Sequence, residues 1–142
     1  MRTATLRYAV PVHEAFTYLA DPRNRPEWQS SLRRVELLDE GAPHVGQRWL
    51  DHTAVGMAPA MELTVLEPDV VWAETGRWRG IEADLTLRFA PYDGGCSVEV
   101  EFEVRGGGLL RPVGWVASGA GLVAVRSDLR RAGRILETRT VA

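Results

Sequence analysis

Two segments in the second half of the chain alternate strictly between apolar and polar residues, and this pattern constrains the fold more than any other feature. Residues 81–89 and 96–104 each place apolar side chains at every second position. A period of two is typical of a strand with one buried and one solvated face. The linker Tyr92-Asp93-Gly94-Gly95 carries glycines that tolerate positive φ. We therefore predict an antiparallel hairpin in a sheet that is covered on one side.

Further strands are predicted before this hairpin. Leu6, Tyr8 and Val10 share one face of a first strand, which ends at Pro11. Gly41, Gly46, Glu67-Pro68-Asp69 and Gly80 mark the turns that follow. The remaining predicted strands are residues 35–38, 47–53, 60–66 and 71–75. Sequential antiparallel pairing then gives one sheet of six to seven strands.

Helical spacing appears in two places. Directly after Pro11, apolar residues at i, i+3, i+4 and i+7 predict a short helix over residues 12–19, which Asp21-Pro22 ends. A second short helix or turn carries Trp28. From Trp115 to Leu136 the same spacing predicts a long helix that covers the sheet. Glycines weaken its first half by about 1 kcal/mol each relative to alanine, which allows a kink, a frayed end or a start near residue 119.

Composition indicates one folded domain over residues 1–142. The chain is 45% hydrophobic and 25% charged, with a formal net charge of -2, and its length suits one core. The lack of a basic excess argues against nucleic acid and membrane surfaces as partners. Cys96 is the only cysteine, residues 1–10 lack the apolar core of a secretory signal, and the uncharged run 112–125 is shorter than the roughly 20 residues that span a bilayer. We expect a cytoplasmic protein.

Short motifs along the chain match a known group of proteins. They are Ala15-Phe16, Leu19-Ala20-Asp21, Pro26-Glu27-Trp28, Gly46, Glu67-Pro68 and Asp128-Leu129. Together with the order of the predicted elements, they resemble the START-like (SRPBCC, helix-grip) superfamily, in its polyketide cyclase/dehydrase branch. The resemblance implies an α+β fold in which a curved antiparallel sheet wraps a long C-terminal helix. It also implies a deep cavity for a hydrophobic, often aromatic, ligand; some members are enzymes and many only bind.

The inward strand faces are almost wholly aliphatic or aromatic, so a ligand enclosed there would be mainly apolar. Tyr8 is the polar exception, and its hydroxyl would hold either a ligand oxygen or another part of the protein. Trp78, in a turn expected at residues 76–80, is a candidate for the entrance. The candidate pocket residues are Tyr8, Trp28, Trp49, Asp51, Met61, Leu63, Trp72, Trp78, Leu85, Leu87, Phe89, Trp115 and Leu122.

The predicted strand over residues 47–53 buries an ionisable group whichever way it faces. Alternation turns inward either Trp49 with Asp51, which we favour, or Leu50 with Arg48 and His52. An inward Asp51 would serve as a general base, and an inward His52 as an acid or base near neutral pH. The candidate catalytic residues are Asp51, His52 and Tyr8.

Metal and cofactor binding are not expected. His13, His44 and His52 show no close spacing. Residues 119–124 match the glycine spacing of dinucleotide sites, but a helix and not a strand precedes them. Small residues there would instead let the long helix approach the sheet or leave room for a ligand.

Three functions fit these patterns. The first is binding of a small hydrophobic, aromatic or polyketide-like molecule, with cyclisation or dehydration as the reaction if the protein is an enzyme. The second is a non-catalytic carrier or sensor for a lipid or quinone. The third is a protein-interaction module, or a homodimer, that uses Trp78, Trp115 and the helical stripe of Arg126, Arg130 and Arg134.

Overall fold

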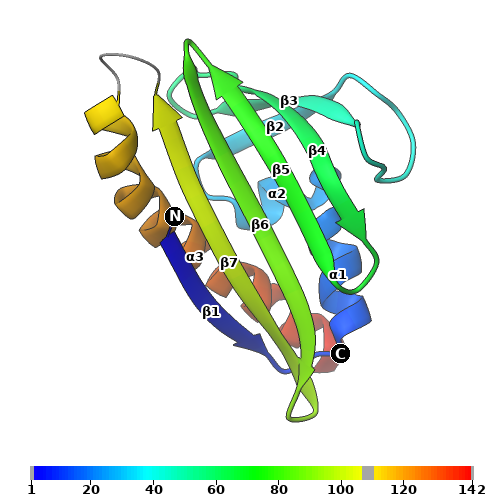
Figure 1. Ribbon diagram of the computed structural model, residues 1–142. Helices are drawn as coiled ribbons and strands as arrows, with labels where there is room; N and C mark the ends of the chain where they lie inside the picture. The colour runs from blue at the N-terminus through cyan, green and yellow to red at the C-terminus, as the bar shows by residue number, and fades with distance from the viewer. Residues whose placement is uncertain (1, 107–110, 142) are drawn as a thin grey trace.

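The computed structural model describes residues 2–106 and 111–141, and within the last helix the side chains of residues 119 and 121–139. One antiparallel sheet curves around the C-terminal helix (Figure 1). In chain order the elements are β1 (Arg2–Tyr8), α1 (Val12–Ala20), the 3-10 helix η1 (Pro22–Asn24), α2 (Arg25–Trp28), β2 (Leu32–Leu37), β3 (Arg48–Thr53), β4 (Ala60–Glu67), β5 (Val71–Trp78), β6 (Ile81–Tyr92), β7 (Gly95–Gly106) and α3 (Arg111–Val141).

The predicted α+β helix-grip fold is confirmed. The seven strands lie in the order β1-β7-β6-β5-β4-β3-β2, and every neighbouring pair is antiparallel. The predicted hairpin is formed by β6 and β7. Its turn residues Asp93 and Gly94 have φ of 46° and 80°, and two positive φ values suit the right-handed twist of the flanking strands.

Several boundaries differ from the sequence prediction; strand β2, for example, spans Leu32–Leu37 where residues 35–38 were predicted. Strand β5 continues through Gly76 to Trp78, because the turn is shorter than the glycines suggested: only Arg79 and Gly80 have positive φ there. Gly76 instead gives room to Met61, whose Sδ would lie 2.7 Å from a Cβ at position 76. Helix α3 begins at Arg111 and not near residue 119, since a proline in the first turn costs no hydrogen bond.

The core runs along the inner face of the sheet and includes residues of β1, α1 and the second half of α3. Phe16 and Phe89 pack edge to face with ring centroids 5.1 Å apart. The buried Tyr8 hydroxyl donates a hydrogen bond of 2.7 Å to the Leu129 carbonyl oxygen, and burial raises the pKa of Tyr8. Gly133 allows this approach, since a Cβ there would lie 2.6 Å from Tyr8 Cε1. Tyr8 therefore ties β1 to α3.

We expect Tyr8→Phe to lower the free energy of unfolding by about 1 kcal/mol, because it removes one buried hydrogen bond and keeps the ring. Urea denaturation would measure the change. Tyr92→Phe is the matched control, because the Tyr92 side chain is 47% exposed. If Tyr8→Phe left stability unchanged but weakened binding of a ligand, the hydroxyl would belong to the ligand site and not to the core.

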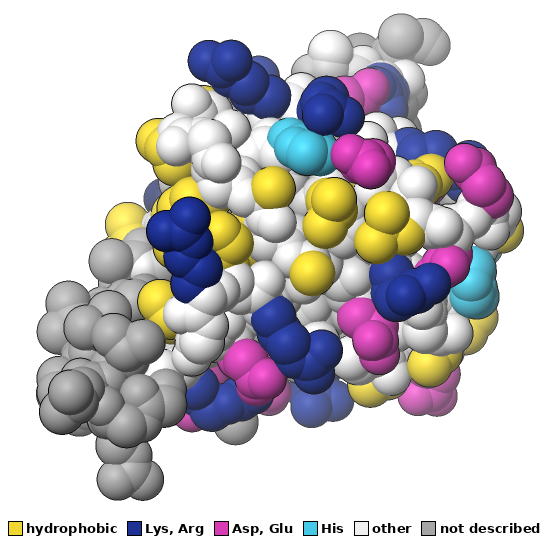
Figure 2. Space-filling view, turned by 90° about the horizontal axis from the view of Figure 1, so that it is seen from above, with side chains coloured by type: hydrophobic (Ala, Val, Ile, Leu, Met, Phe, Trp, Pro, Cys, Tyr) yellow, Lys and Arg dark blue, Asp and Glu magenta, His cyan; other side chains and the backbone are white. Residues whose placement is uncertain are grey.

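Charged side chains occupy the outer face of the sheet and the surface around it. Arg105 of β7 pairs with Asp84, Glu82 and Glu103 on this outer face. Seen from above, at 90° to the view of Figure 1, the molecule shows apolar side chains in the middle with charged ones around them (Figure 2). Among the described residues, no helix is both long and apolar enough to cross a membrane.

Candidate ligand cavity

A cavity of about 390 Å³ lies between the sheet, α2 and α3. Its size falls in the range of sites for small molecules. Small residues from three elements hollow it out: Gly76 of β5, Ala83 of β6, and Gly121 and Ala124 of α3 all line it. Gly121 also lets α3 approach β7, since a Cβ there would lie 2.1 Å from Phe102 Cε1. The spacer role predicted for small residues in this helix is confirmed at Gly121.

Most of the cavity wall is apolar. Strands β5 to β7 supply side chains that alternation turns inward, and α3 closes the opposite side. The main apolar lining residues are Trp28, Met61, Trp78, Ile81, Leu85, Phe102, Val104 and Val125. A bound molecule would therefore make most of its contacts with hydrocarbon and aromatic surface.

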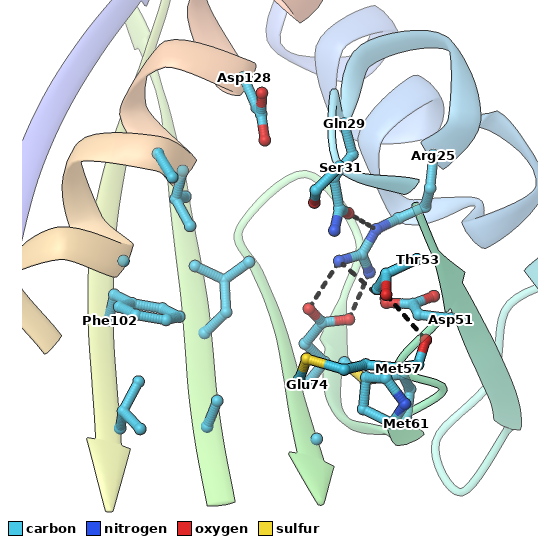
Figure 3. A pocket seen from close by; sticks show the side chains of 18 of the residues that line it. Arg25, Gln29, Ser31, Asp51, Thr53, Met57, Met61, Glu74, Phe102 and Asp128 are labelled. Atoms are coloured by element: carbon cyan, nitrogen blue, oxygen red, sulfur yellow. Dashed lines mark hydrogen bonds and ion pairs between the residues drawn. The ribbon is translucent and has the colours of Figure 1, made fainter. Parts of the chain in front are cut away.

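A buried ion pair lies at the polar end of the cavity (Figure 3). Arg25 of α2 is 3% exposed and Glu74 of β5 is 5% exposed. The guanidinium donates from Nη1 to Glu74 Oε2 and from Nη2 to Oε1 at 2.8 Å, while its Nε donates to Gln29 Oε1 at 2.9 Å. This bidentate geometry is the strong form of a carboxylate contact. It fixes α2 against β5.

Three tryptophan rings surround the Arg25 guanidinium. The Arg25 Cζ atom lies 5.5 Å from the ring centroid of Trp28, 5.7 Å from that of Trp72 and 6.0 Å from that of Trp49. Such cation–π contacts add to the stabilisation of a desolvated cation. Burial opposes the charged form of Arg25, but Glu74 and Asp51 outweigh it and raise its pKa. Arg25 is therefore a fixed positive charge in the protein interior.

Asp51 of β3 lies beside this pair. The side chain is 3% exposed, and its Oδ1 accepts a hydrogen bond of 2.9 Å from Trp49 Nε1. Its Oδ2 lies 4.0 Å from Arg25 Nη2, too far for a hydrogen bond. Burial raises the pKa of Glu74 and the neighbouring Asp51 adds to this rise, while the contact with Arg25 acts against it.

Asp128 of α3 enters the cavity from the opposite side and points toward the Arg25–Glu74 pair (Figure 3). It is 9% exposed, and its Oδ1 accepts hydrogen bonds from the Ser30 hydroxyl at 2.9 Å and from the Ser30 backbone N–H at 3.3 Å. This contact ties the loop after α2 to the long helix. The polar end thus draws on α2, β3, β5 and α3.

The structure brings part of the predicted pocket set together. Trp28, Asp51, Met61, Trp78 and Leu85 line the cavity. The side chain of Trp115 lies outside the described residues. In strand β3, Trp49 and Asp51 face inward, which is the favoured alternative.

The other predicted pocket residues do not line this cavity. They pack in the core instead, because the same strand faces supply both the core and the cavity wall: these residues are Tyr8, Trp49, Leu63, Trp72, Leu87, Phe89 and Leu122. His52 alternates with Asp51 and faces outward, where its Nε2 lies 2.9 Å from Glu36 Oε1. Of the three catalytic candidates, only Asp51 reaches the cavity.

Sequence reasoning missed Arg25, Glu74 and Asp128. Strand alternation carried the signal for Glu74, since it lies two residues from the buried Trp72 and two from Gly76. Asp128 lay in a motif used only to recognise the fold. The described residues hold no group of three or more His, Cys, Asp or Glu side chains placed to bind a metal ion.

A curved sheet closed by a long helix, with an apolar cavity between them, defines the class of helix-grip domains. Within this class, the chain belongs to the family described as polyketide cyclase / dehydrase and lipid transport, whose model matches residues 3–139. No curated protein matches the sequence.

Solved structures share the fold at low sequence identity. The di-domain ARO/CYC StfQ from the steffimycin biosynthetic pathway is 17% identical with a TM-score of 0.79, over 99% of this chain and 51% of that one. A conserved protein from Geobacillus kaustophilus is 13% identical with a TM-score of 0.74, over 96% and 94% of the two chains. Ara h 8.0201 is 12% identical with a TM-score of 0.69, over 96% and 97%.

Proposed function

We propose that the protein binds a small hydrophobic molecule in the cavity between α3 and the sheet. The observation that carries this proposal is the cavity itself, whose volume of about 390 Å³ is lined by mainly apolar side chains with one polar end. Sites for small molecules combine these two properties, because the apolar wall supplies affinity and a few polar groups fix orientation. Membership of a family described by cyclase, dehydrase and lipid transport activities supports the same proposal.

Filling the cavity should weaken binding. Ala83 lines it from β6, and we expect Ala83→Phe to weaken binding of the uncharged dye Nile red at least tenfold, about 1.4 kcal/mol. Fluorescence titration measures the affinity. The matched control is Ala90→Phe, because Ala90 lies on the exposed face of the same strand. Equal binding by the two variants would place the dye elsewhere, and no binding by the wild-type protein would contradict the proposal.

The reaction alternative, cyclisation or dehydration, draws support from one feature, the buried carboxylates of Asp51 and Glu74 beside Arg25 at the polar end. Asp51 is the freer of these two, because two guanidinium nitrogens hold Glu74. We infer that any proton transfer in the cavity runs through Asp51. The cytoplasmic location, the absence of a cofactor and the homodimer stay predictions.

A further inference from the structure

One row of inward-facing side chains crosses the sheet along the cavity, from β3 to β7. The register of the strands places these residues side by side, in the order Trp49, Met61, Gly76, Ala83 and Val104. All of them except Trp49 line the cavity. The row has no side chain at Gly76 and only a methyl group at Ala83, so β5 and β6 leave a gap between the larger side chains of β4 and β7.

The Met61 side chain leans from β4 into this gap. A Cβ on Gly76 would lie 2.7 Å from Met61 Sδ and 3.0 Å from its Cε, so the end of the methionine covers the bare backbone of β5. On the other side of Met61, Trp49 is fully buried and its indole N–H is held by Asp51 at 2.9 Å. Phe102 lies across the cavity (Figure 3). The free space next to the end of Met61 is therefore on the cavity side.

Methionine suits a wall that adapts to its ligand. Its side chain is unbranched, with three rotatable bonds, and fills irregular space without a fixed shape. While the end of Met61 lies over Gly76, the cavity is narrowed there, and a ligand that reaches this position has to displace it. Each CH2 group that a ligand buries gains about 0.8 kcal/mol, or about fourfold in affinity, and a group forced into occupied space loses that gain.

We propose that Met61, lying over Gly76, sets the size of the ligand that the cavity accepts. Ligands short enough to leave Met61 in place gain affinity with each added carbon, and the gain ends at the length that meets the methionine. This inference rests on the proposed function, because it names the residue that selects among ligands of the same cavity. It adds a size limit, with its structural cause, to a site so far defined by its apolar character.

A series of uncharged single-chain probes, the 1-alkanols from hexanol to hexadecanol, tests the inference. Displacement of Nile red, followed by fluorescence, gives the affinity of each alcohol for the wild-type protein and for Met61→Ala. We expect affinity to rise about fourfold per carbon up to a limiting length. Met61→Ala removes the Cγ, Sδ and Cε atoms, so the limit should move to chains longer by about two carbons. An unchanged limit, or a wild-type affinity that rises over the whole series, overturns the inference.

Gly76→Ala should move the limit in the opposite direction. The new Cβ would overlap Met61 Sδ and push the end of that side chain toward the cavity, so the limiting chain should become shorter by about one carbon. The double variant with Met61→Ala separates the two positions: without the sulfur, the Cβ at position 76 has only an ordinary contact, 4.0 Å to the Ala83 carbonyl oxygen. Gly76→Ala should then shift the limit much less. The same shift with and without the methionine overturns the inference.

Val65→Ala is the matched control, because Val65 lies on the same strand as Met61, is 43% exposed and does not line the cavity. Its limit should equal that of the wild-type protein. Circular dichroism checks the fold of each variant; should Met61→Ala fail to fold, Met61→Val takes its place, since valine is too short to reach Gly76. If Nile red binds but no alcohol displaces it, or no variant moves the limit, only the size selection is wrong. If neither the dye nor any alcohol binds, both proposals are wrong.

Discussion

Glu74→Ala is expected to lower the free energy of unfolding by about 3–5 kcal/mol, because it leaves the Arg25 guanidinium buried without its bidentate partner. Asp51, at 4.0 Å from Arg25 Nη2, compensates only in part. Since small domains are stable by about 5–15 kcal/mol in total, the variant should unfold at much lower urea concentration. Urea denaturation followed by circular dichroism measures this shift.

Two controls separate the buried pair from a general effect of charge. Glu82→Ala breaks the exposed contacts of Glu82 with Arg77 and Arg105, and we expect no resolvable loss of stability from it. The double variant Arg25→Met with Glu74→Leu removes both charges of the bidentate pair but leaves the buried Asp51 without the guanidinium 4.0 Å away, so only part of the lost stability should return. A double variant as unstable as Glu74→Ala would contradict this account.

Gly95→Ala is expected to destabilise the protein by about 2–3 kcal/mol, because a Cβ overlaps the backbone of the neighbouring strand. At position 95 it would lie 2.1 Å from the Tyr8 carbonyl oxygen and 3.3 Å from Ala9 Cα. Backbone atoms have no alternative rotamer, so β1 and β7 must move apart where Tyr8 pairs with Cys96. Thermal denaturation would report the loss.

The matched glycine is Gly119 of α3. A Cβ at position 119 would meet nothing within 4 Å, and alanine is the better helix former, so Gly119→Ala should stabilise the protein by about 0.5–1 kcal/mol. Opposite signs for the two substitutions would confirm that the steric contact matters at position 95. Equal destabilisation by both would show that it does not.

The sheet was predictable from sequence because its strands carry a strong local signal. Strict alternation in β6 and β7, and the turn at Asp93 and Gly94, specify a hairpin without any long-range information. The limits of α3 were harder, since glycines lower helix propensity while packing against the sheet stabilises the helix regardless. Trp78 was assigned to a turn because Gly76 looked like a breaker, whereas it serves as a spacer for Met61.

The site was predictable only in part. The inward face of β3 followed from alternation, but the division of inward residues between core and cavity depends on how close α3 comes to each strand. Large side chains such as Tyr8 and Leu87 fill the space at one end, and small ones such as Ala83 leave it open at the other. The role of Arg25 could not be predicted from the sequence, because Arg25 lies in a helix of only four residues and its partner Glu74 is 49 positions away.

The pairing of β1 with β7 sets an order on folding during synthesis. Arg2 lies opposite Phe102 and Tyr8 opposite Cys96, so the first strand made has no partner until the last one has left the ribosome. At about 5–20 residues per second, β1 waits several seconds while the hairpins between β2 and β6 assemble. A ribosome stalled before β7 would present a nascent chain with β1 unpaired and one edge of β6 open, the kind of surface that chaperones bind.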